Sequence, residues 1–273
     1  MPSTYAHFYF GEQVAARVGN DLQQLIFRKL PYYQIGLHGP DILFYYKPFS
    51  TNPVNQTGVA LHRQPAEKFL AAAPKAISKS GDPEAATAYI LGFICHFMLD
   101  SECHPYVNDL MEATGLSHYE IETEFERTLM LKNKLDPLSY RPTGHLTATP
   151  EIAECIACFF EEYGVSAKQI RQSVKSMRLY LNLLVTPKSW QRSLVSGALK
   201  ISGSYETMKG LLMNRQPNPL CSEGYKELSR LLEEAVKPTA DLITEYFRIL
   251  PATTTSISVL PAISTKTKSI NTV

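Results

Sequence analysis

Residues 82–105 read DPEAATAYILGFICHFMLDSECHP, and this stretch decides the fold. It opens with Asp82 as a helix N-cap and Pro83 at the first helical position, which predicts a helix running towards Asp100. The side chains around His96 are apolar on every side, and a helix that is apolar all round is buried. We therefore expect a buried helix here.

Helix start signals recur along the rest of the chain, whereas no strand pattern recurs. Together with the apolar patterns, they predict further helices over residues 11–30, 65–78, 117–131, 149–163, 166–186 and 222–250. The segment 31–63 is rich in Tyr, Phe, Gly, Pro and Asn, and we expect a long functional loop there. The expected fold is all-α, with a single multi-helix domain over residues 1–251 and a disordered Thr/Ser-rich tail over residues 252–273.

The composition is that of an ordinary globular protein. Hydrophobic residues make up 44% and charged residues 19%, and the net charge of +1 gives no sign of a nucleic-acid surface. No apolar run is long enough for a transmembrane segment, and no secretory signal is visible. Five cysteines are too few, and odd in number, for a disulfide framework. We therefore expect a cytoplasmic protein.

Two histidines have an acid four residues later: His96 with Asp100, and His118 with Glu122. On a helix this spacing puts both side chains on one face, within reach of one metal ion. The spacing alone is weak evidence, because seven histidines and 26 acids in 273 residues give about 0.7 such pairs by chance. The context is stronger, since a carboxylate in a buried helix is costly unless a cation compensates it.

The His96–Asp100 pair has two interpretations on these residues alone: a metal site, or a buried hydrogen bond that serves only the fold. His104 favours the metal site, because it follows Asp100 by another four residues. Imidazole and carboxylate ligands without cysteine suit zinc better than iron or manganese. The sequence thus favours a zinc site.

These residues resemble the zinc-dependent phospholipase C family. The similarity rests on the run GFICHFMLDSECHP at 92–105, on HYEIE at 118–122, and on Tyr5-Ala6-His7, Gly39-Pro40-Asp41 and Leu61-His62 upstream. The resemblance implies a helical fold with zinc ions lining a cleft, and it implies eight metal ligands for two to three ions. One zinc would be held by Asp41, His62, His96 and Asp100, and a second by His104, His118 and Glu122. A third would be shared by Asp100, His7 and the chain's own N-terminal amine and carbonyl.

The function that the resemblance implies is that of a zinc-dependent phosphodiesterase, similar to phospholipase C, in which a zinc-bound hydroxide attacks the phosphorus. Zinc lowers the pKa of bound water to about 7, which makes hydroxide available at neutral pH. Asp41 is the expected catalytic residue that orients or deprotonates this water; the alternative is a ligand role alone. The expected partner is a phospholipid or another phosphodiester, with transient contact to a membrane surface.

Two other functions stay open at this point. The chain could hydrolyse nucleotides or other small phosphodiesters, because the single-strand-specific zinc nucleases are similar in design. Alternatively, it could be a non-catalytic, zinc-stabilised domain that binds lipid or protein.

Several residues near the expected site carry secondary predictions. His38 is expected to hydrogen-bond a ligand carboxylate, and His145 to be exposed in a loop. The aromatic side chains on either side of Asp41 are expected either to pack as core or to form a pocket for a choline-like cation. They are Tyr32, Tyr33, Phe44, Tyr45, Tyr46 and Phe49.

Overall fold

A computed structural model of the chain describes residues 4–250, apart from the side chains of residues 222 and 223. The predicted disordered tail over 252–273 lies outside the described residues. So does the N-terminal amine that was expected at a third zinc.

The described residues form helices joined by turns, and no β-strand occurs among them. The fold is therefore all-α, as expected. The elements are α1 Thr4–Ala15, α2 Asn20–Arg28, α3 Leu30–Gly36, η1 Gly39–Tyr45, α4 Pro53–Arg63, α5 Ala66–Lys79, α6 Pro83–Thr114, α7 His118–Lys132, α8 Pro150–Phe160, η2 Glu161–Tyr163, α9 Ala167–Leu184, α10 Ser189–Ile201, α11 Tyr205–Met208, η3 Lys209–Leu211, η4 Pro219–Cys221 and α12 Ser222–Ile249.

The helix that the sequence placed at the centre of the fold is α6. Its N-cap is Asp82, whose carboxylate accepts a hydrogen bond of 3.0 Å from the backbone N–H of Ala85. The helix runs well beyond Asp100, through Pro105, and ends at Gly115 in the left-handed conformation. Proline removes one backbone donor, and the carbonyl left without it belongs to Ser101, an exposed residue.

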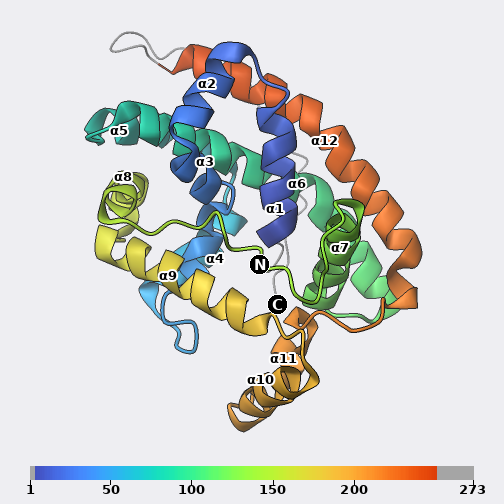
Figure 1. Cartoon of the computed structure of the whole chain (residues 1–273). Helices are drawn as coiled ribbons and strands as arrows, with labels where there is room; N and C mark the ends of the chain where they lie inside the picture. Colours follow the sequence, from blue (N-terminus) through green and yellow to red (C-terminus); the bar gives the residue numbers. More distant parts are fainter. Residues whose placement is uncertain (1–3, 251–273) are drawn as a thin grey trace.

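Other helices surround α6 over most of its length. Figure 1 shows α1, α3 and α12 on one side of it, and these helices and α5 all pack against it. α3 approaches most closely, because Gly36 and Gly92 meet at the crossing. A Cβ added to Gly92 would lie 2.2 Å from the carbonyl oxygen of Tyr33, so only glycine fits there. The space that Gly92 leaves is thus taken by the backbone of α3.

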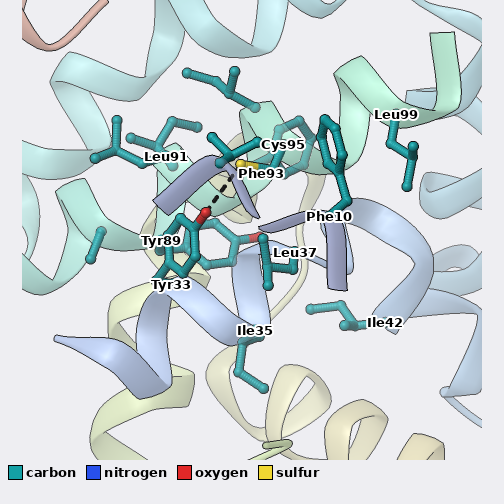
Figure 2. Packing of buried hydrophobic residues seen from close by; sticks show 14 of the residues in the cluster. Phe10, Tyr33, Ile35, Leu37, Ile42, Tyr89, Leu91, Phe93, Cys95 and Leu99 are labelled. Atoms are coloured by element: carbon teal, nitrogen blue, oxygen red, sulfur yellow. Dashed lines mark hydrogen bonds between the residues drawn. The ribbon is translucent and has the colours of Figure 1, made fainter. Parts of the chain in front are cut away.

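The apolar core lies at this crossing. Tyr33 of α3 is buried, and its hydroxyl donates to the carbonyl of Gly11 at 2.8 Å and lies 3.3 Å from the sulfur of Cys95. Figure 2 shows this contact among the packed side chains of α1, α3 and α6. Tyr33 therefore belongs to the core and not to a cation pocket. Phe44, another member of the aromatic run, stacks against His62.

Two predictions about the N-terminal third are wrong. The expected helix over 11–30 is two helices, α1 and α2, separated at Gly19, whose extended backbone caps α2. The expected loop over 31–63 is mostly helical, with α3, η1 and α4. Pro31, Pro40 and Pro53 stand at the first turns of helices, where a missing N–H costs nothing, and Asn52 caps α4 through a capping box.

The remaining predicted helices are confirmed to within a few residues, as α5, α7, α8 with η2, α9 and α12. Ser117 and Ser166 cap α7 and α9 with their side chains, as the sequence predicts. α10 and α11, between α9 and α12, were not foreseen. Within residues 4–250, no helix combines the length and the apolar character that a membrane crossing needs.

Candidate metal centre

Five elements carry the eight side chains that the sequence predicts as metal ligands. α6 contributes three, His96, Asp100 and His104, at intervals of four residues, so that all three lie on one face of the helix. α7 follows after the turn at Gly115 and packs against α6. The remaining ligands come from α7, α1, η1 and α4: His118, Glu122, His7, Asp41 and His62.

Asp100 lies at the middle of the group. Its Oδ1 is 3.2 Å from His7 Nε2 and 3.7 Å from His104 Nε2. Its Oδ2 is 3.4 Å from His96 Nε2 and 4.0 Å from His62 Nε2. One carboxylate therefore faces imidazoles from three helices, which is the arrangement expected of a bridging group.

Asp41 and His62 face each other across the next part of the group, with Asp41 Oδ1 at 2.9 Å from His62 Nε2. The other ring nitrogen of His62, Nδ1, lies 2.7 Å from the carbonyl of Gly58 and donates its hydrogen there. This hydrogen bond fixes the tautomer, so that Nε2 presents a lone pair to the site, as a metal ligand must.

Gly39 allows Asp41 to reach the site. It adopts a φ of +46°, which side chains disfavour, and a Cβ added there would lie 2.3 Å from the ring of His96. The backbone of η1 can therefore pass directly against His96. This explains in physical terms why a glycine precedes Pro40 and Asp41 in the motif.

Glu122 joins the histidines at the junction of α6 and α7. Its Oε1 is 3.0 Å from His118 Nε2 and 3.4 Å from His104 Nε2. His118 is partly exposed, whereas His104 and Glu122 are buried, so this end of the group lies nearest to solvent.

Ligand atoms close enough to hold a metal ion form three groups among the described residues. They are His7 with His96 and Asp100, Asp41 with His62 and His96, and His104 with His118 and Glu122. All eight predicted residues are included. Their division differs from the expected one at two residues: His96 lies in both of the first two groups, and Asp100 lies only with His7 and His96.

The buried polar atoms of the group fit a cluster of cations. Both ring nitrogens of His7 and of His96 are buried without a hydrogen-bond partner in the described part of the chain, and so are Asp100 Oδ2 and Glu122 Oε2. Each such atom costs about 1–3 kcal/mol if nothing satisfies it. The donor set, five imidazoles and three carboxylates, is one that zinc accepts. The residues present therefore fit zinc.

The carboxylates stay ionised although they are buried. Burial raises the pKa of Asp100, but His104 and His96 outweigh this effect and hold the pKa well below its ordinary value. For Glu122, His118 and His104 likewise overcome burial and lower the pKa to about 2. Three negative charges are thus concentrated at one interior point, which attracts metal cations.

The histidines divide in their protonation. Burial lowers the pKa of His104, but Asp100 and Glu122 more than compensate and raise it to about 9. For His96, burial outweighs the effect of Asp100 and lowers the pKa to about 4. Without metal, a proton on His104 therefore balances part of the negative charge, whereas His96 is neutral and ready to bind an ion.

Two residues behave differently from their predictions. His145 was expected to be exposed, but its ring stacks on Phe8 and its Nε2 lies 2.7 Å from His38 Nε2. His38 was expected to bond a ligand carboxylate, and among the described residues its hydrogen-bond partner is instead His145. Burial lowers the pKa of both, and that of His145 falls to about 4, so one neutral ring donates to the other.

Sequence reasoning missed Glu126, one turn after Glu122 on α7. Its buried carboxylate accepts hydrogen bonds from the backbone N–H groups of Tyr5 and, at 3.2 Å, Ala6. These are free donors of the first turn of α1, so Glu126 fixes the start of the helix that carries His7. The glutamate's spacing from Glu122 was the only signal in the sequence.

A pocket opens beside the group and reaches His62, His96 and Asp100. Its walls are mostly apolar. They include Pro40, Leu61, Phe69, Phe93 and Phe97. His62, His96 and Asp100, with Gln64 and Ser101, supply its polar lining.

Comparison with known proteins gives one match. A family model described as zinc dependent phospholipase C matches residues 6–176, which include all eight predicted ligands. No curated protein and no solved structure matches the chain significantly.

Proposed function

Because the chain belongs to the zinc-dependent phospholipase C family, we propose that it hydrolyses the phosphodiester of phospholipids at the candidate metal centre. The observation that carries the proposal is the meeting of five imidazoles and three carboxylates at one interior point, where several buried polar atoms have no hydrogen-bond partner among residues 4–250. Bound zinc supplies a water of lowered pKa and a Lewis acid for phosphoryl oxygens.

Asp41 is the residue that we assign to the attacking water. Burial raises its pKa, but His96 and His62 hold the pKa far below the ordinary value, so the carboxylate is ionised at neutral pH. It therefore accepts a hydrogen bond from a water molecule and orients it. Its place on η1, against the ring of His62, keeps it within the group without a flexible connection.

The pocket supports a substrate that is part polar and part apolar. Phe69, Phe93 and Phe97 line it together with His62, His96 and Asp100 of the candidate centre. A phosphodiester held at the centre would thus lie beside aromatic rings that suit the glycerol side of a phospholipid. This arrangement favours a lipid over a fully polar substrate such as a nucleotide.

The test is hydrolysis of a soluble chromogenic phosphorylcholine ester by the zinc-loaded protein. We expect turnover that a chelator abolishes and added zinc restores. Asp41→Asn should lower kcat by about 10²- to 10⁴-fold, the usual contribution of a positioned acid–base group. Asp109→Asn, which changes an exposed aspartate of the same helix bundle, is the matched control and should leave kcat unchanged.

Metal analysis of the same samples separates the alternatives. If Asp41→Asn retains zinc but loses turnover, the catalytic role stands. Unchanged turnover would show that Asp41 is at most a ligand. Zinc-loaded protein that leaves every phosphodiester intact would point to a structural metal centre, and faster turnover of nucleotide diesters than of the choline ester would change the substrate class.

A further inference from the structure

One segment of the chain carries only basic charged residues. Between Gly164 and Tyr205 the chain has no Asp or Glu, although it has nearly equal numbers of acids and bases overall. The bases in this stretch are Lys168, Arg171, Lys175, Arg178, Lys188, Arg192 and Lys200. Within the described residues, none of them forms an ion pair. Arg171 and Arg192 donate to backbone carbonyls, and the other bases have no carboxylate within ion-pair distance among residues 4–250.

The same segment exposes large apolar side chains. α10 buries only Leu199, whereas Trp190, Leu194 and Ile201 are exposed to 59%, 64% and 91%. At about 100° per residue, these three side chains fall within roughly 40° of one another around the helix, and Leu199 lies on the opposite side. α10 therefore presents a continuous apolar stripe to solvent.

The inner face of α10 is fixed to the protein, which sets the direction of the stripe. Arg192 lies on the same side as Leu199 and donates to the carbonyl of Met213 at 2.7 Å. Figure 1 shows α10 and α11 projecting at the end of the molecule, beyond α9. The stripe of Trp190, Leu194 and Ile201 thus points away from the body of the protein.

α9 extends this surface towards the metal centre. Leu179 and Leu183, one helical turn apart, are exposed next to Arg178, and Phe49 packs its exposed ring edge-on against Tyr180. α9 also packs against η1, the element that carries Asp41. α9 therefore connects these exposed apolar and basic side chains to the element that carries Asp41.

We propose that α10 and the C-terminal half of α9 dock the protein on the surface of a bilayer that contains anionic phospholipid. An amphipathic helix with aromatic and aliphatic residues on one face and bases around it lies in the headgroup region of such a surface. A second copy of the chain fits less well, because two faces that carry only positive charge repel each other. The inference rests on the proposed function in that a lipid hydrolase needs contact with its substrate surface.

Trp190 makes the docking measurable, because it is the only tryptophan of the chain. Its emission should shift to shorter wavelength when the full-length protein meets vesicles of phosphatidylcholine with phosphatidylglycerol, and the protein should sediment with them. Pure phosphatidylcholine vesicles should bind at least about tenfold more weakly, and raised salt should weaken binding to the anionic vesicles. Equal binding to both vesicles, or to neither, would overturn the proposal.

Two double variants locate the surface. Leu194→Gln with Ile201→Gln should lower the vesicle partition coefficient at least about tenfold, because two exposed apolar side chains no longer enter the headgroup region. The matched control, Phe27→Gln with Leu131→Gln, removes two equally exposed apolar side chains elsewhere and should bind like the wild type. Circular dichroism checks that both variants are folded. Equal binding by both double variants would exclude α10, and a dimer that only the α10 variant loses would identify the stripe as a self-association face.

Activity assays separate this inference from the proposed function. The α10 variant should hydrolyse the soluble chromogenic ester at the wild-type rate and lose activity only on anionic vesicles. Vesicle binding without any hydrolysis would refute the proposed function and leave the docking surface standing. Hydrolysis of the soluble ester without vesicle binding would refute the docking surface and leave the proposed function standing.

Discussion

At the scale of single residues, the candidate centre depends on carboxylates that the fold keeps ionised in its interior. Asp100 faces four histidines from three helices, and Glu122 faces His104 and His118. The pairs within α6 and within α7 could be predicted from the sequence, because a spacing of four residues places both side chains on one face of a helix. The contacts across helices could not, because they depend on how α1 and η1 pack against α6.

Glu126 gives a prediction about His7. Glu126→Ala would leave the N–H groups of Tyr5 and Ala6 buried without an acceptor, so we expect a loss of about 1–3 kcal/mol in unfolding free energy and a weaker zinc site at His7. Glu126→Gln keeps an acceptor oxygen and should lose less than half as much. Urea unfolding and zinc titration measure both effects, and equal losses in the two variants would contradict the capping role.

The pKa of Glu126 adds a pH dependence to the same comparison. Burial raises this pKa to about 8, so the native carboxyl binds a proton at neutral pH that the unfolded chain has released. The stability that this group contributes is therefore present below its ordinary pKa and is lost as the pH rises through about 8. Glu126→Gln should remove that part of the alkaline loss.

His104 predicts how the metal-free protein responds to pH. Its pKa, raised to about 9, means that the folded protein holds a proton there that the unfolded chain releases near its ordinary pKa of about 6.5. The stabilisation is complete below about pH 6.5 and disappears as the pH rises through about 9. Chelated protein should thus lose stability across this range, and zinc-loaded protein should not. Parallel stability curves for the two forms would show that zinc does not replace that proton.

At the scale of elements, α6 organises the site because it carries three predicted ligands and contacts most of the helices that carry the others. The sequence predicted the start of α6 from Asp82 and Pro83 but not its length, since Pro105 is a helix breaker in most settings. It also predicted a loop at 31–63, where prolines and glycines instead serve as first-turn residues and close-contact points. Whether a proline or glycine of this segment serves in that way depends on the helix that packs against it, which the local sequence does not show.

The crossing of α3 and α6 is tested by Gly92→Ala. The new Cβ would collide with the carbonyl of Tyr33, so we expect a loss of at least about 2 kcal/mol and a disturbed position of Asp41, which follows α3 in the chain. The matched control is Gly197→Ala, also inside a helix but with open space around it, which should stabilise α10 by about 0.5–1 kcal/mol. Thermal unfolding compares them, and a neutral Gly92→Ala would rule out the close crossing.

At the scale of the whole molecule, one chain combines a buried ligand group with an exposed basic and apolar surface. The family match ends at residue 176, and α10 lies after it. The all-α class and most helices of the C-terminal half could be predicted from caps and periodicity. α10 could not, because it starts after Lys188, which is not a typical N-cap residue, and so lacks a clear start signal. The cytoplasmic location and the disorder of residues 252–273 stay predictions.

Anomalous scattering at the zinc absorption edge from crystals of the zinc-loaded protein tests the central claim most directly. The account predicts two or three peaks, each within bonding distance of side chains in the three ligand groups, with Asp100 beside more than one peak. The absence of any peak among these side chains, or zinc bound only elsewhere on the molecule, would contradict it.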